Sequence, residues 1–437
     1  MLSYPILQRL GSNAGLGSLE RRATIYLAVG LIHKNVQNSH SFESPSVETS
    51  RLHMVIISWL VLAGQVIAQT PPTAVNPITT DLKLSDFNPK PQLKVPVTDL
   101  KQAKFPVIDI HSHFRIKMRH DPQLLDDFVQ LMDRQNIAVS TSLDGTLGPV
   151  LDEHIQFLWT KHRSRFAIFA NLDWQGTGAA DQPATWACNQ PDFAHRTVIE
   201  LEDAQRRGVC GLKLFKLFGL GYRNPDGTLI AIDDPRFDPI WAACGELGLP
   251  IIMHTADPSA FFEPITPQNE RYEELSRHPD WHFPADKFPS RASLHAARNA
   301  LFKRHPKTTF IAAHLGNDGE DLKETAKLLD DHPNIYVEIA SRISELGRQP
   351  FSAREFLIKY QDRILFGTDG PWPEMRYQSY WRFLETRDEY FPYSEKPFPP
   401  QGFWRIYGVH LPDEVLEKIY SRNALKLLPS LNLTKPR

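Results

Sequence analysis

The feature that most constrains the fold of this chain is a series of eight short apolar segments that alternate with helix-compatible stretches. Near-continuous apolar runs of this length are typical of parallel strands that are covered on both faces. We expect the strands at 106–113, 137–143, 166–172, 209–216, 250–255, 309–314, 334–340 and 363–369. We expect the helices at 121–135, 152–163, 192–207, 234–247, 291–304, 319–331 and 353–361. Eight strands that alternate with helices predict an α/β protein of the (β/α)₈ TIM barrel class.

The residues before the barrel differ in character. Residues 1–53 show no sustained helical or strand period, so we expect an unstructured or mis-assigned N-terminal extension. Residues 54–68 form an apolar run that ends in small residues, as a secretory signal peptide does, with Gln69 as the first mature residue. Residues 69–104 are rich in proline and predict an extended lead-in. The barrel domain then occupies residues 105–437.

The signal-peptide interpretation requires Met54 as the true start of the chain, because a signal peptide begins a protein. It predicts export to the periplasm or the exterior, whereas the alternative, a buried or frayed segment, predicts a cytoplasmic protein. The apolar run is shorter than the roughly 20 residues that cross a bilayer, so we expect no stable membrane span.

Composition excludes some function classes. The chain has 437 residues with 49 Lys+Arg against 51 Asp+Glu, a net charge of -2, which gives no electrostatic reason to expect nucleic acid as a partner. Three cysteines without a CxxC pair exclude a disulfide framework and a zinc knuckle.

Metal-competent side chains gather at the carboxyl ends of the expected strands. His111 and His113 are two residues apart on the first strand and therefore face the same side. The other three, His254, His314 and Asp369, end the fifth, sixth and eighth strands. A lone buried histidine is usually a satisfied structural residue. Five such groups at the face where barrel enzymes carry their active sites instead predict coordination of a cation.

Several motifs carry a family resemblance that spans about Val107 to Leu428. They read VIDIHSH, GLKLF, IIMH, FIAAHLG and ILFGTDGPWP. The sequence resembles the amidohydrolase superfamily, in the branch that holds lactonases, carboxylic-acid hydrolases and the aminocarboxymuconate-semialdehyde and resorcylate-type decarboxylases.

The resemblance implies a single mononuclear metal site at the C-terminal face of the strands. Its ligands would be His111, His113, His254 and Asp369, with His314 as an acid/base or substrate-polarising histidine that donates to a developing oxyanion. Asp369 would also carry a proton during catalysis. Imidazole nitrogens and one carboxylate suit Zn²⁺ first, with Mn²⁺ or Fe²⁺ as alternatives.

Two lysines and one arginine leave alternatives open. Other amidohydrolases carry a carboxylated lysine on the fourth strand that bridges two metals, and Lys213 and Lys216 lie there. We expect these lysines to pair with carboxylates or with substrate instead. Lys216 and Arg342 are candidate binding residues for a substrate carboxylate, and the alternative for Arg342 is a surface ion pair with Glu345. For Glu338 we expect a structural partner.

Two long stretches, 257–289 and 371–400, are rich in aromatic residues and predict loops that wall a pocket or form an oligomer contact. The favoured function is a metal-dependent hydrolase that cleaves an amide, ester or lactone of a small molecule with metal-activated water. The alternative is a non-oxidative metal-dependent decarboxylase that uses the same residues. A barrel that binds a ligand without turnover is the third class, and the complete set of candidate ligands disfavours it.

Overall fold

The computed structural model of the chain describes residues 81–83, 86–87, 89–394 and 401–433. The expected N-terminal extension (1–53) and signal segment (54–68) lie outside the described residues. The described residues 89–394 and 401–433 belong to one compact unit of the chain.

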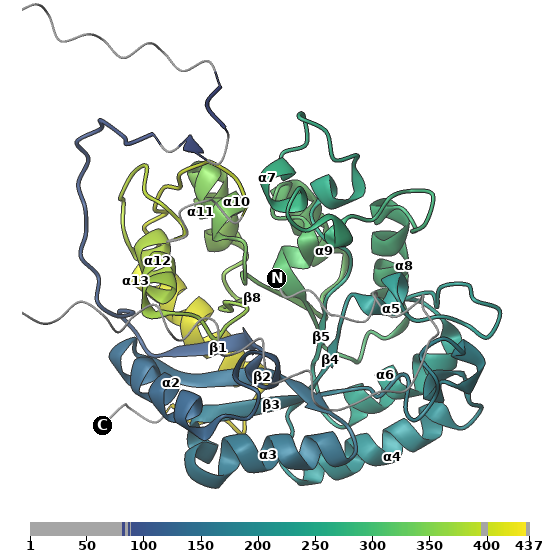
Figure 1. Cartoon of the computed structure of the whole chain (residues 1–437). Coiled ribbons are helices and arrows are strands. Elements are labelled where there is room, and N and C mark those ends of the chain that lie inside the picture. The colour runs from purple at the N-terminus through teal and green to yellow at the C-terminus, as the bar shows by residue number, and fades with distance from the viewer. Residues whose placement is uncertain (1–80, 84–85, 88, 395–400, 434–437) are drawn as a thin grey trace, which may run out of the picture. The chain divides into compact units, whose positions relative to one another are not determined.

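Eight parallel strands lie side by side in chain order (Figure 1). They are β1 (Val107–Ser112), β2 (Ile137–Thr146), β3 (Phe166–Asn171), β4 (Gly211–Leu214), β5 (Ile251–Met253), β6 (Phe310–Ala312), β7 (Ile335–Glu338) and β8 (Ile364–Leu365). The ring closes where Ile110 donates its N–H to the Phe366 carbonyl at 3.0 Å and Ser112 pairs with Gly370. The predicted TIM barrel is confirmed, with each strand at its expected place.

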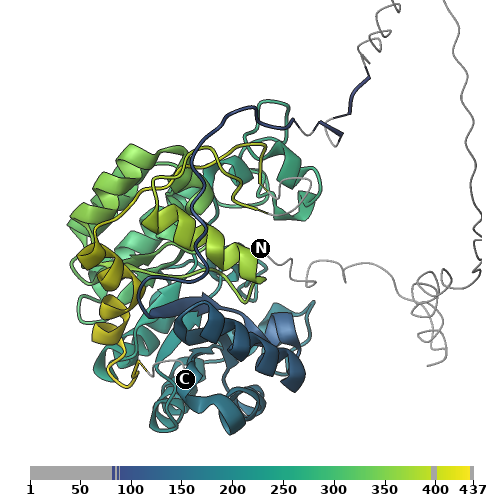
Figure 2. The same cartoon turned by 90° about the vertical axis from the view of Figure 1, so that its left-hand side faces the viewer.

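All seven expected helices are present and lie outside the strands (Figures 1 and 2). They are α2 (Pro122–Arg134), α3 (Pro149–His162), α4 (Phe193–Arg206), α6 (Asp238–Glu246), α8 (Arg291–Arg304), α9 (Leu322–Asp331) and α11 (Pro350–Lys359). Side chains of Asp121, Ser290 and Asp321 accept hydrogen bonds from the first N–H groups of α2, α8 and α9, which satisfies donors that a helix start leaves free.

The described chain contains further helices that the sequence analysis did not predict. They are α1 (Phe114–Met118), α5 (Leu217–Leu220), α7 (Tyr272–Leu275), α10 (Ile343–Arg348), α12 (Glu374–Glu385) and α13 (Asp413–Glu417). The closing IYSRNALKLL segment resembles a final helix, and the structure confirms it as a π-helical turn at Lys418–Arg422 followed by α14 (Asn423–Leu427). The interpretation of 371–400 as one long loop is therefore wrong. Tyr377, Tyr380 and Trp381 are large apolar residues at helical spacing, and α12 buries them.

Side chains of successive strand residues alternate between two cores. On β1, Val107 packs in the cluster that includes helix residues such as Phe128 and Leu158. Ile108 and Ile110 pack with Ile252, Ile311 and other residues of the smaller cluster, which also contains Ala424 and Leu428. This period-two pattern fixes which side of the barrel each site residue faces.

Residues 89–104 contain no helix or strand. They are held along the barrel by Thr98, which donates from N and Oγ1 to Asp388 at 2.8 and 2.7 Å, and by Lys104, which donates from N to Glu385 at 3.0 Å. Among the described helices, none combines the length and the apolarity that crossing a bilayer requires.

Trp381 joins the barrel to its C-terminal helices and gives a test of the fold. It is fully buried, stacks on Phe366 with ring centroids 5.1 Å apart, contacts Tyr420 and donates from Nε1 to Gln135 at 3.0 Å. We predict that Trp381→Ala lowers the free energy of unfolding by about 3–5 kcal/mol. Loss of the indole ring would leave a cavity between several elements, which cannot all move to fill it.

Urea unfolding of the purified protein measures this change. Met375→Ala on the same helix is the control, because Met375 is 60% exposed and its loss is expected to change stability by about 0.5 kcal/mol or less. Equal unfolding midpoints for the two variants would contradict the packing described here.

Candidate metal centre

Three of the expected ligands meet where β8 closes on β1. His111 is the fifth residue of β1 and His113 follows the strand, so both rings face the same side. Pairing of Gly370 with Ser112 brings Asp369 beside them. Asp369 Oδ1 lies 3.3 Å from His113 Nε2 and 3.7 Å from His111 Nε2. All three side chains are buried, and their ligand-competent atoms lie within 4.8 Å of one another.

Two further carboxylates orient these histidines. Glu338 Oε1 lies 3.0 Å from His111 Nδ1, and Asp144 Oδ1 lies 2.7 Å from His113 Nδ1. Because an ionised carboxylate only accepts, each Nδ1 carries a hydrogen when the ring is neutral, and each Nε2 presents a lone pair toward Asp369. Two lone pairs and a carboxylate oxygen then face one another in a buried space. This donor set fits a divalent metal ion.

The electrostatics of the three groups also favour a positive centre. Burial, with Lys213 nearby, holds the pKa of His111 well below its ordinary value, so this ring is neutral as a ligand must be. Burial also opposes protonation of His113, but Asp144 and Asp369 outweigh it and raise the pKa of this imidazole. Burial opposes ionisation of Asp369, yet the hydrogen bond with His113 and the nearby His111 hold its pKa well below the usual range.

His314 lies beside the same centre in a left-handed turn, with a φ of 57°. Its ring centroid is 4.8 Å from that of His111 and 4.6 Å from that of His254. Nδ1 lies 2.8 Å from the carbonyl oxygen of Ala340, which only accepts, so Nδ1 carries the hydrogen and Nε2 is an acceptor. Burial holds the pKa of His314 well below its ordinary value. The neutral ring therefore offers an acceptor at Nε2, and the expected role of His314 as an acid/base or substrate-polarising histidine stays a prediction.

His254 follows β5 directly. Among the described residues, two groups of side chains bring their ligand atoms close enough to hold one metal ion. One group is His111 with His113 and Asp369, the other is His111 with His314 and Glu338, and His254 belongs to neither.

Instead, His254 Nε2 lies 3.3 Å from Oδ1 of Asp257. The other oxygen of this fully buried carboxylate accepts from Lys216 Nζ at 2.5 Å, and that ammonium lies 5.3 Å from the ring centre of Phe283. Lys216, the candidate substrate-binding lysine, is therefore already paired with a buried carboxylate of the protein itself.

Lys213 lies within β4 with 1% of its surface exposed, and its Nζ has no hydrogen-bond partner among the described residues. Burial lowers the pKa of Lys213 to about 8. An amine with this lowered pKa gives up its proton more readily than an ordinary lysine, which is compatible with either interpretation of the fourth-strand lysine, a partner of substrate or a carboxylated bridge.

Arg342 is fully buried at the start of α10. It donates from Nη2 to Asn317 at 2.5 Å and from Nη1 to the Ser341 carbonyl at 2.9 Å, and Glu345 lies 3.9 Å away. The ion pair with Glu345 exists, but the expectation that it lies on the surface is wrong. The carboxylate-clamp role of Arg342 stays a prediction.

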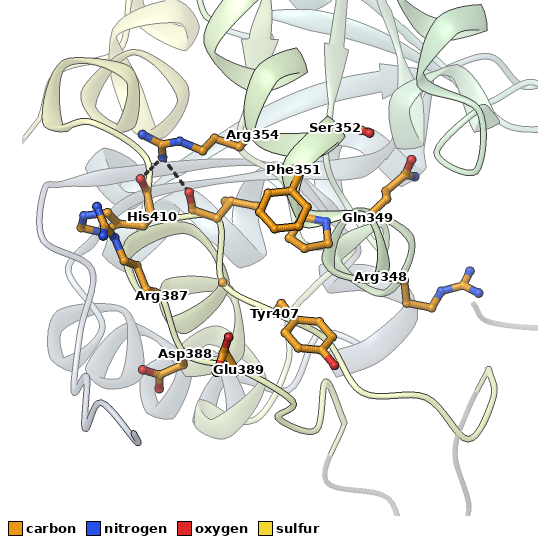
Figure 3. A pocket seen from close by; sticks show the side chains of 13 residues that line it. Arg348, Gln349, Phe351, Ser352, Arg354, Arg387, Asp388, Glu389, Tyr407 and His410 are labelled. Atoms are coloured by element: carbon orange, nitrogen blue, oxygen red, sulfur yellow. Dashed lines mark hydrogen bonds between the residues drawn. The ribbon is translucent and has the colours of Figure 1, made fainter. Parts of the chain in front are cut away.

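The sequence analysis did not name Asp144 or Asp257 and gave Glu338 only a structural role. The available signal was position: Asp144 and Asp257 lie just beyond the carboxyl ends of expected strands, and Glu338 lies two residues before the end of another. A separate cavity of about 830 Å³ lies between the start of α11 and residues 387–389 and 407–410 (Figure 3). Phe351 and Tyr407 line it, and Arg354 donates to the carbonyls of Val409 and His410 there. It shares no lining residue with the metal centre.

Comparison with known proteins finds relatives that are similar in sequence to this chain. Two gamma-resorcylate decarboxylases, from Rhizobium sp. (strain MTP-10005) and Rhizobium radiobacter, are each 26% identical to the chain, over 242 and 238 residues. These alignments cover 51% and 50% of this chain and 64% and 63% of the enzymes, so the chain spans less than two thirds of the length of these relatives.

Among solved structures, a 2,6-dihydroxybenzoate decarboxylase from Rhizobium is 18% identical with a TM-score of 0.46, over 75% of this chain and 99% of that one. The model of the amidohydrolase family matches residues 108–430, which include all of the barrel strands except the first residue of β1, and every candidate ligand. By the extent of that match, the chain belongs to the amidohydrolase family.

Proposed function

We propose that this enzyme is a metal-dependent, non-oxidative decarboxylase of an aromatic acid with a hydroxyl group beside its carboxylate. The observation that carries the proposal is the sequence similarity to two gamma-resorcylate decarboxylases. The sequence analysis ranked hydrolysis of an amide, ester or lactone first, and the relatives support the decarboxylase that it ranked second. The fold alone does not choose between them, because one barrel hosts many reactions.

The metal is proposed to be one divalent ion held by His111, His113 and Asp369, with His254 as the fourth protein ligand. Zinc fits the imidazole-rich set, and manganese or iron suits the same residues with added oxygen ligands. When bound, such an ion supplies positive charge beside the oxygen atoms of the substrate. The carboxylates of Glu338 and Asp144 contact the Nδ1 atoms of His111 and His113, and their negative charge would partly balance the charge of the ion.

We assign the proton transfers of the reaction to residues of this chain. Loss of CO₂ breaks the bond between ring and carboxylate and leaves the electron pair on the ring carbon, which takes a proton. His314 is proposed to hold the substrate hydroxyl through Nε2, which is an acceptor in the neutral ring. Asp369, with Ser341 donating to Oδ2 at 3.2 Å, takes the hydroxyl proton and returns it to the carbon. The enzyme takes up one proton from solvent per turnover.

Incubation of the metal-loaded enzyme with 2,6-dihydroxybenzoate in ¹⁸O-labelled water tests the proposed reaction. We expect CO₂ in equal amount to 1,3-dihydroxybenzene, and no label in the ring product, since no water oxygen joins the ring. Absence of CO₂ from a panel of hydroxybenzoates, with label entering the acid product of a lactone, ester or amide, would assign the enzyme to the hydrolases instead.

Glu338→Gln tests the metal centre itself. The amide keeps the size of the side chain but removes the charge behind His111, so we predict a fall of about 10–100-fold in metal affinity. Competition with a chromogenic chelator measures the affinity for Zn²⁺ and Mn²⁺. Glu355→Gln, the same change at an exposed position on α11, is the control and should bind as the wild type does. Unchanged affinity in a folded Glu338→Gln variant would remove His111 from the proposed ligand set.

A further inference from the structure

Lys117 is a third lysine close to the metal centre, and its contacts differ from those of Lys213 and Lys216. It lies in α1, which starts directly after His113, and its own N–H donates to the His113 carbonyl at 3.2 Å. Its Nζ donates to the carbonyl oxygen of Asp369 at 2.5 Å and to that of Pro371 at 3.4 Å. The same ammonium lies 3.6 Å from the ring centre of Trp372.

The carbonyl that Lys117 binds belongs to a residue in an uncommon backbone conformation. Asp369 has a φ of 63°, in the left-handed region that residues other than glycine rarely adopt. It lies beyond the end of β8, where no strand ladder continues to hold it. A hydrogen bond from an ammonium is stronger than one between neutral groups, so it opposes relaxation of this backbone toward negative φ.

Neighbouring contacts complete a clamp around the turn. Gly370 N donates to the His111 carbonyl at 3.2 Å, and His113 N donates to the Gly370 carbonyl at 2.7 Å. On the other side, Trp372 Nε1 donates to the Thr368 carbonyl at 2.8 Å. Lys117 supplies a side-chain hydrogen bond to the Asp369 carbonyl. It therefore links the helix that follows His113 to the backbone of Asp369.

We propose that Lys117 is a positioning residue that sets the distance between His113 Nε2 and the carboxylate of Asp369, and so determines metal affinity. This inference rests on the proposed metal site and not on the reaction that the site performs. A role in binding substrate does not fit, because two carbonyls and an aromatic face already occupy the ammonium.

Lys117→Met tests the proposal, since methionine retains much of the apolar stem and removes the charge and the donors. The probe is Zn²⁺ or Mn²⁺ alone, in competition with a chelator, on metal-free full-length protein. We expect the dissociation constant to rise by about 10-fold or more, as for other residues that orient ligands. Lys117→Arg keeps a cationic donor and should recover most of the affinity. Arg115→Met, an exposed change on the same helix, should leave it unchanged.

The unfolding midpoint of each metal-free variant and its steady-state kinetics separate the alternatives. We expect similar midpoints, and at saturating metal a lower kcat with KM unchanged. Wild-type metal affinity in Lys117→Met, or an equal loss in Arg115→Met, would overturn the proposal. So would a raised KM with metal affinity retained, which would make Lys117 a substrate-binding residue. If Lys117→Met does not fold, Lys117→Gln replaces it, and failure of both to fold would overturn the positioning role. Because metal binding needs no turnover, the outcomes for metal affinity do not depend on whether the enzyme releases CO₂.

Discussion

The contact between the carboxylate of Asp369 and the two imidazoles of β1 is the constraint on which the rest of the site depends. It places groups from the first and last strands within 3.3 and 3.7 Å, which requires the barrel to close between β8 and β1. Gly367 shows how tight that closure is, because a Cβ at this position would lie 2.6 Å from Glu338 Oε2 and 3.2 Å from the Cβ of His111. Only glycine leaves Glu338 room to reach His111.

Burial of so many ionisable groups needs a physical reason. Asp144, Glu338 and Asp369 are all at least nine-tenths buried, and desolvation of a carboxylate costs several kcal/mol unless nearby charges and hydrogen bonds offset it. Histidines and backbone N–H groups supply part of that compensation, as where Glu338 accepts from the N–H groups of His314 and Ala340. A divalent cation among His111, His113 and Asp369 would supply the rest, so the buried charges themselves favour a metal, independently of any relative.

Much of the fold could be predicted because parallel strands leave a strong local signal. Eight buried apolar runs gave the barrel, and the spacing of two between His111 and His113 gave a shared direction. Contacts between residues far apart in the sequence could not be predicted in the same way. The pairing of Asp144 with His113, of Asp257 with His254 and Lys216, and the burial of Arg342 follow from packing of loops after different strands. Helix α12 was missed because prolines and aromatic residues on both sides of it resemble a loop.

Anomalous diffraction from crystals of the metal-loaded protein, recorded on both sides of the absorption edge of the metal, tests the central claim most directly. The account predicts one peak per chain, about 2.0–2.2 Å from Nε2 of His111, Nε2 of His113 and an oxygen of Asp369. Two peaks bridged by a carboxylated Lys213, or a peak that has neither histidine as a ligand, would contradict it.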